Sequence, residues 1–142
     1  MLVQNYSDLT LKDMILRDGG ADTYILSNNF GTVHLQGTTE IHANPGHVAF
    51  DLWYGMANDG SYDDGVTVFI DDPTVVIDGP VEFGHARRIT DEAQFLANTH
   101  LYVCEGFDRD GLEVRLTNPT KYSGYTWELA ENGYYELKPI AK

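Results

Sequence analysis

The sequence predicts an all-β fold, an antiparallel β-sandwich or jelly roll with one short helix near residues 90–98. Segments rich in Val, Ile, Thr, Tyr and Phe alternate with turn residues every eight to twelve positions, a spacing typical of sandwiches and barrels. About eleven such segments are too many for one open sheet, so the sheets must close or stack. The length of 142 residues and a hydrophobic fraction of 42% predict one core. We therefore expect a single domain over 1–142.

The first two thirds of the chain contain seven strand candidates, each bounded by Gly, Pro, Asn or Asp. They are TYILS (23–27), GTVHLQG (31–37), TEIHA (39–43), HVAFDLWYGM (47–56), VTVFID (66–71), TVVID (74–78) and PVEFG (80–84). In VTVFID, Val66, Val68 and Ile70 share one face, which predicts burial of that face. Because proline cannot donate to a ladder, Pro73 and Pro80 predict that the strands beside them lie at sheet edges.

The remaining parts of this region are less regular. Residues 7–17 are compatible with a short helix or with a strand that turns Leu9 and Leu11 inward, and we take 1–20 as a candidate N-terminal arm. The helix near 90–98 is predicted from Thr90 as an N-cap and from the acids that follow it.

The last third predicts a four-stranded antiparallel meander. Its strands are HLYVCEGF (100–107), LEVRLT (112–117), YTWELA (125–130) and YYELKPI (134–140). Asp110-Gly111 and Asn132-Gly133 predict tight hairpin turns, because type I′ turns need positive φ at both central residues. In YTWELA, Tyr125, Trp127 and Leu129 share a face that we expect to pack inward.

Charge excludes one class of partner. The chain carries a net charge of −13, and between Arg17 and Arg87 it has eleven acids and no Lys or Arg. Such a field repels phosphate backbones, so we predict no nucleic-acid binding. We also predict no membrane span, because there is no apolar run of 18 residues.

The N-terminus and the cysteine content point to a cytoplasmic origin. The N-terminus carries no secretory signal pattern, and the leading Met predicts a complete chain made in a cytoplasm. The single cysteine, Cys104, allows no internal disulfide, and we expect it to be a buried strand thiol.

The acidic stretch NDGSYDDGVTVFIDD (58–72) raises the question of a metal. An EF-hand pattern fails there because Asp64 and Ile70 occupy the Gly and Glu positions of that loop. Asp59, Asp63 and Asp64 are kept as a candidate calcium site, although a solvent-facing loop is the favoured interpretation.

Other chemistry has weaker support. His34 and His42 would face each other if the chain turned back near Gly37, and with Glu40 they could bind zinc or iron. However, HxH and HExxH spacings are absent, as are the motifs of nucleophilic catalysis and nucleotide binding. We therefore predict a non-enzymatic protein with no catalytic or cofactor-binding residues and no cofactor other than calcium.

Aromatic residues are further candidates for a core or binding role. They can form core, anchor a protein interface or stack on sugars. The prominent ones are Trp53, Tyr54, Tyr122, Tyr125, Trp127, Tyr134 and Tyr135.

In its length, Met start, strand density and low pI, the chain resembles phage head decoration (cement) proteins, which are small β-sandwich or jelly-roll modules. The resemblance implies a structural virion protein, made in the host cytoplasm, that binds the capsid surface and stabilises it. It also implies a capsid protein as partner and a homo-oligomer such as a trimer. The alternative is a carbohydrate-binding β-sandwich module supported by calcium. A third class, a cupin-like or other small β enzyme, would need a metal.

Overall fold

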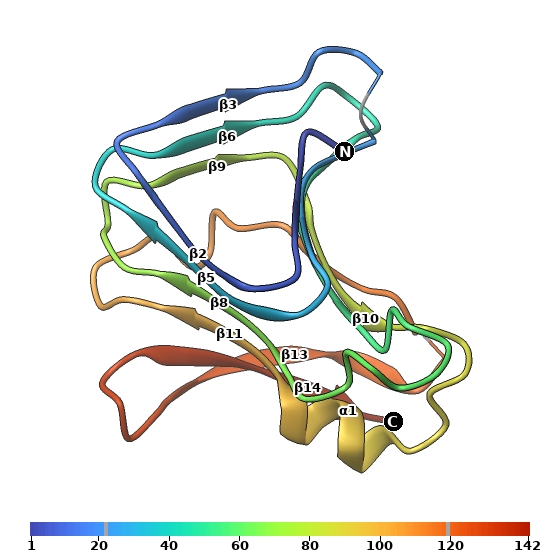
Figure 1. Cartoon of the computed structure of the whole chain (residues 1–142). Helices are drawn as coiled ribbons and strands as arrows, with labels where there is room; N and C mark the ends of the chain where they lie inside the picture. The colour runs from blue at the N-terminus through green and yellow to red at the C-terminus, as the bar shows by residue number, and fades with distance from the viewer. Residues whose placement is uncertain (22, 119) are drawn as a thin grey trace.

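The chain winds into a three-sided parallel β-helix (Figure 1). The computed structural model describes residues 1–21, 23–118 and 120–142. We call each turn of the coil a rung. Each of the first three rungs adds one strand to each of three sheets, and the later part of the chain adds none to the third sheet. Except in the C-terminal hairpin, consecutive strands therefore lie in different sheets, and equivalent strands of successive rungs pair in parallel.

The three sheets are named A, B and C. Sheet A contains, in order, β1 (Val3–Asn5), β4 (Tyr24–Asn28), β7 (Val48–Tyr54), β10 (Val81–His85) and β12 (Val114–Leu116). Sheet B contains β2 (Asp8–Lys12), β5 (Gly31–Gln36), β8 (Val66–Ile70) and β11 (Thr99–Val103), followed by the antiparallel strands β14 (Tyr135–Ala141) and β13 (Tyr122–Leu129). Sheet C contains β3 (Ile15–Arg17), β6 (Glu40–His42) and β9 (Val76–Asp78).

One helix, α1 (Glu92–Asn98), lies between β10 and β11. Asp91 is its N-cap and accepts from the backbone N–H groups of Ala93 and Gln94. In the part of the chain that the structure describes, no helix is long and apolar enough to cross a membrane.

The core is a column of stacked side chains inside the coil. In sheet A, the inward residues Val3, Leu26, Phe50, Val81 and Val114 are in register on successive strands. Sheets B and C add equivalent columns, such as Val33 above Val68 and Leu101. Each rung therefore buries its apolar side chains against the next, which is how solenoid repeats obtain a continuous core.

Buried asparagines turn the chain from sheet A to sheet B. The Asn5 side-chain amide donates to the side-chain oxygen Oδ1 of Asn28 at 2.9 Å, and the Asn28 side-chain amide donates to the backbone oxygen of Thr67 at 3.0 Å. Both asparagines are buried, so these bonds satisfy polar groups that water cannot reach.

The two ends of the coil differ. At the N-terminal end, β1, β2 and β3 are each the last strand of their sheet. At the other end, the hairpin of β13 and β14 continues sheet B past β11 (Figure 1). Phe107 and Leu112, from the loop after β11, lie near Val76 and Ile77 of β9. Phe95 of α1 packs inside this end, with its ring centre 5.5 Å from that of Phe83.

The structure corrects the predicted fold class. The antiparallel sandwich or jelly roll is wrong because the sheets are mostly parallel, although the single short helix is confirmed. The helix N-cap is Asp91 and not Thr90. All seven strand candidates of the first two thirds form strands, β4 to β10. Runs of β-forming residues between turn residues located the strands, but such runs do not distinguish parallel from antiparallel partners.

The C-terminal meander is also corrected. Only β13 and β14, joined at Asn132-Gly133, form the predicted hairpin; β11 pairs with β14, and β12 pairs in parallel with β10. Asp110-Gly111 lies in a turn that carries the chain from sheet B to sheet A. Leu129, expected inward, is 66% exposed, because β13 is an outer strand.

The structure also differs from the expectations for the strands beside Pro73 and Pro80 and for the N-terminal arm. Pro73 and Pro80 lie in turns just outside the strands, and the neighbouring β8 and β10 are interior strands of their sheets, whereas β9 is an edge. Residues 1–20, the candidate arm, contain β1, β2 and β3, and Leu11 of β2 is buried.

Candidate functional site

The outer face of sheet A carries a row of polar side chains in register. Adjacent strands place Gln4, Ser27, Asp51, Glu82 and Arg115 beside one another. Because neighbouring strands lie about 4.8 Å apart, this polar row spans about 19 Å. It crosses five strands that are far apart in sequence, so only the coil brings these groups together.

Asp51, at the centre of the row, has an unusual environment. Burial is the main cause that raises the pKa of Asp51 to about 7, and repulsion from the Glu82 carboxylate raises it further. The Ser27 hydroxyl, which donates a hydrogen bond to Asp51 at 2.7 Å, lowers the pKa and offsets part of this rise. Burial and Glu82 also raise the pKa of Tyr24 to about 12. A carboxyl that exchanges its proton near neutral pH, beside a second carboxylate, is typical of functional sites.

Trp53 lies next to this row and separates two hollows. The smaller hollow, of about 160 Å³, is lined by Tyr24, Ser27, Asn29 and Asp51, among others. Trp53 lines both hollows and is half-buried. Within the described residues its indole N–H has no hydrogen-bond partner and its ring has no aromatic neighbour, so both are available to a ligand.

The larger hollow has a volume of about 460 Å³, within the range of small-molecule sites. It is lined by Trp53, His85, Arg87, Ile89, Thr90, Thr117, Asn118 and Lys121. Gly84 pairs with Trp53 on the adjacent strand, and a Cβ at Gly84 would lie 1.6 Å from the Thr117 hydroxyl. Glycine is therefore required for Thr117 to lie this close to the strand.

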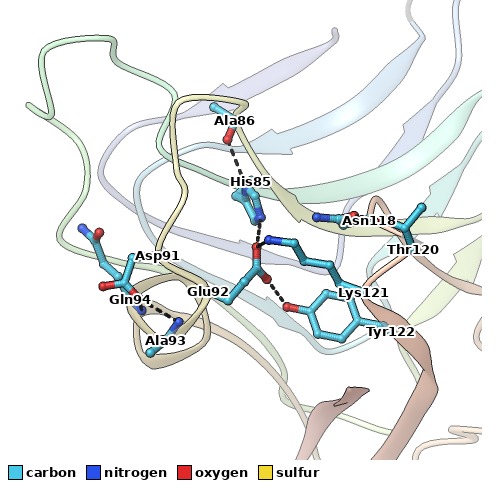
Figure 2. A network of polar contacts seen from close by, with 10 residues as sticks. All are labelled: His85, Ala86, Asp91, Glu92, Ala93, Gln94, Asn118, Thr120, Lys121 and Tyr122. Atoms are coloured by element: carbon cyan, nitrogen blue, oxygen red, sulfur yellow. Dashed lines mark hydrogen bonds and ion pairs between the residues drawn. The ribbon is translucent and has the colours of Figure 1, made fainter. Parts of the chain in front are cut away.

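A network around Glu92 forms one wall of the larger hollow (Figure 2). Glu92 accepts from His85 Nε2 at 2.8 Å, from Lys121 Nζ at 3.1 Å and from the Tyr122 hydroxyl. Burial raises the pKa of Glu92, but these hydrogen bonds outweigh it and hold the pKa below its ordinary value. The other His85 ring nitrogen, Nδ1, contacts the Ala86 carbonyl oxygen at 2.9 Å. The network joins β10, α1 and β13 and fixes the position of Lys121.

Arg87 is the free cation of this site. It is exposed, and it makes no ion pair or hydrogen bond with the residues that the structure describes. Its neighbour Arg88, by contrast, is paired with Asp63. In a chain of net charge −13, a hollow lined by Arg87, Lys121 and His85 is a local concentration of basic groups.

A second group of aromatic rings lies on the outer face of sheet B. His34, Phe69 and Tyr102 are in register, with ring centres 4.6 Å and 4.9 Å apart and near-parallel planes. Because each ring covers the face of the next, these faces are not free for a ligand. We assign this stack a structural role.

The three carboxylates of the predicted calcium site have different surroundings. The Asp59 carboxylate accepts from the Ser61 backbone N–H at 2.9 Å, Asp63 pairs with Arg88, and Asp64 is exposed. In the described ranges, no group of three or more His, Cys, Asp or Glu side chains is arranged to hold a metal. Calcium binding by Asp59, Asp63 and Asp64 stays a prediction.

The predicted histidine pair is not formed. His34 and His42 lie on β5 and β6, which belong to different sheets. His34 contacts Asp71 at 2.8 Å, whereas His42 contacts Asp78 at 2.9 Å and Glu40 at 2.7 Å. The supposed hairpin near Gly37 is instead a corner of the coil.

Sequence reasoning missed most of this site. It named Trp53 as a candidate sugar-binding ring but not Asp51, Arg87 or Lys121. The available signals were the polar Asp51 inside the apolar strand VAFDLWY and the return of basic residues at Arg87 and Arg88. Neither signal shows that the residues meet, because that depends on the rung geometry.

Comparison with known proteins found no matching family model, no similar curated protein and no similar solved structure.

Proposed function

We propose that the protein binds an acidic carbohydrate on the outer face of sheet A. The observation that carries this proposal is the position of Trp53 between a basic hollow and a row of hydrogen-bonding groups. A sugar ring needs an aromatic surface for its C–H face and polar groups for its hydroxyls. An acidic sugar also needs a cation, and Arg87 is unpaired among the described residues.

The charges on the two sides of Trp53 orient the ligand. The sugar carboxylate faces Arg87 and Lys121, because charge-assisted hydrogen bonds to a guanidinium are strong and directional. The hydroxyls on the opposite side face Ser27, Asn29 and Asp51, which line the smaller hollow. The two hollows together accommodate more than one sugar unit, so the proposed ligand is an oligosaccharide.

Titration calorimetry with oligogalacturonate and with its methyl-esterified, neutral form tests the proposal. We expect binding of the acidic form and loss of binding in Trp53→Ala. Arg87→Gln should bind about ten- to a hundredfold more weakly, because a hydrogen bond to a charged group contributes about 1.5–3 kcal/mol. Arg17→Gln removes the same charge on sheet C and should leave affinity unchanged. If an array of acidic glycans shows no binding, the proposal is wrong.

A second candidate function is cleavage of the bound sugar chain. It is favoured by the pKa of Asp51, about 7, beside Glu82. In this reaction Asp51 gives its proton to the glycosidic oxygen as the C–O bond breaks. Glu82 takes a proton from the water whose oxygen bonds to the anomeric carbon. A pair of carboxyls, one that gives a proton and one that takes a proton, is the usual device of glycoside hydrolysis.

Product analysis distinguishes binding from cleavage. If cleavage occurs, wild-type protein shortens the oligosaccharide, and Asp51→Asn binds it but releases no products. Absence of products from wild-type protein under conditions of saturated binding would leave binding alone, in agreement with the sequence-based expectation of a non-enzymatic protein.

The capsid-surface role predicted from the sequence has less support than sugar binding. It was based on a resemblance to β-sandwich modules, and the parallel β-helix removes that part of the resemblance. Length, acidity and strand density still agree with it. Co-sedimentation with purified capsids is the measurement that would test it.

A further inference from the structure

The N-terminal rung presents three unpaired strand edges. β1, β2 and β3 each have a neighbour on one side only, at the same end of the coil (Figure 1). The backbone N–H and C=O groups on the other side are a template for further pairing. Solenoid proteins usually cover such an end with a capping element.

The orientation of these backbone groups can be derived for β2. Ser7 accepts a hydrogen bond from the Thr32 N–H, and the Asp13 N–H donates to the Gln36 oxygen, so residues 7 and 13 face the next rung. Backbone groups of a parallel strand alternate between its two sides. The N–H and C=O of Thr10 therefore face the open edge.

Apolar side chains gather at the same end. Half of the exposed large hydrophobic residues of the described chain lie in its first fifteen positions: Met1, Leu2, Tyr6, Met14 and Ile15. A concentration of exposed apolar groups beside unpaired edges marks an interaction surface.

The charge of this end permits approach of a second copy. Residues 1–18 carry three acids and two bases, a net charge of −1, whereas the rest of the chain carries −12. Elsewhere two copies would repel each other strongly. The N-terminal rung is thus the part of the molecule where self-association costs least.

We propose that two copies pair through their N-terminal rungs, end to end, about a twofold axis. A twofold rotation perpendicular to the coil reverses the direction in which the chain circulates. All strand pairs across the contact are therefore antiparallel, the arrangement with the more stable hydrogen-bond pattern. With the axis normal to sheet A, β1 pairs with its own copy and β2 pairs with β3 of the partner. The contact is isologous, so the assembly closes as a dimer.

A head-to-tail filament is disfavoured by the other end. There the hairpin of β13 and β14 continues sheet B in the antiparallel sense, and Phe107 and Leu112 line a hollow together with Val76 and Ile77 of β9. That end does not present three parallel edges for the N-terminal rung to continue.

Light scattering during gel filtration tests the proposal with the whole chain. We expect wild-type protein at twice 15.9 kDa. Thr10→Pro, which removes an N–H from the open edge without removing one that faces β5, should give the monomer. Ile15→Lys should do the same, because it places a charge at the rim of the contact.

The matched control is Ile140→Lys, the same substitution at an exposed isoleucine (44% exposed, against 55% for Ile15) near the opposite end. It should remain a dimer. A monomeric wild type at all accessible concentrations, a species larger than a dimer, or a dimer that persists in both Thr10→Pro and Ile15→Lys would overturn the proposal. Hydrogen exchange gives a second measurement, since amides of β2 should lose protection in Ile15→Lys and keep it in Ile140→Lys.

Discussion

At the scale of single residues, the buried carboxyl of Asp51 makes stability depend on pH. Its pKa in the folded protein, about 7, lies above the ordinary value of 3.8, so the folded state holds the proton more tightly than the unfolded chain. The stabilisation that this provides is complete below about pH 4 and is lost as the pH rises through 7. Wild-type protein should therefore lose stability over this range because of Asp51.

Asp51→Asn should remove that loss, since an amide does not titrate and can still accept from Ser27. The free energy of unfolding of Asp51→Asn minus that of wild type should be about 2–3 kcal/mol larger at pH 8 than at pH 5. Urea denaturation at the two pH values measures this difference. Asp64→Asn, at an exposed carboxylate, controls for the loss of one charge. A difference between Asp51→Asn and wild type that does not change with pH would contradict the pKa.

A second residue-scale prediction concerns Asp63. The sequence favours a solvent-facing loop for Asp63 and Asp64, and substitutions at such surface positions change stability by less than about 0.5 kcal/mol. The structure separates them, because the half-buried Asp63 pairs with Arg88 and Asp64 is exposed. We expect about 1–2 kcal/mol of destabilisation in Asp63→Asn and less than about 0.5 kcal/mol in Asp64→Asn. Equal melting temperatures of the two variants would contradict this, and a calcium-dependent loss in both would indicate a metal site.

At the scale of elements, the asparagine corner between sheets A and B should be a main determinant of stability. Asn28→Ala leaves the Thr67 carbonyl without its side-chain amide donor, whereas the Asn5 side-chain amide keeps the backbone oxygens of Ser7 and Phe30 as acceptors. We expect a loss of about 1–3 kcal/mol, the cost of one buried polar group that loses its partner. Asn58→Ala, in an exposed loop, is the control for asparagine removal. Thermal unfolding followed by circular dichroism measures both.

The elements themselves were predictable to different degrees. Strands β4 to β10 could be placed because each is rich in β-branched or aromatic residues and lies between turn residues, and in β8 the alternation of Val66, Val68 and Ile70 also shows the buried face. Their partners could not be assigned, since side-chain period is the same in parallel and antiparallel sheets. The turn residues Asp110-Gly111 led to a wrong hairpin prediction for a related reason. Asp110-Gly111 turns the chain at a corner of the coil, and a glycine turn does not reveal whether the next strand returns beside the previous one.

At the scale of the whole molecule, irregular rung lengths hide the repeat. The stacked residues Val3, Leu26, Phe50, Val81 and Val114 are separated by 23, 24, 31 and 33 positions. Solenoids are recognised in sequence by a fixed period, and the long loop before β8 and helix α1 break that period. The candidate site could not be predicted for the same reason. Asp51, Glu82 and Trp53 form a site only because one rung lies on the next.

Net charge gives the last prediction, in which salt acts with opposite signs on the fold and on the site. The chain carries −13, so its charges repel one another in the compact state, and added salt screens that repulsion. The melting temperature should therefore rise as NaCl is increased to about 0.15 M. Binding of an acidic oligosaccharide depends on attraction to Arg87 and Lys121, which the same ions weaken, so its affinity should fall. Differential scanning calorimetry and titration calorimetry in one salt series measure both quantities. If affinity rises with salt, the ligand is not held by the basic hollow; if the melting temperature falls, ion pairs such as that of Asp63 with Arg88 outweigh the general repulsion.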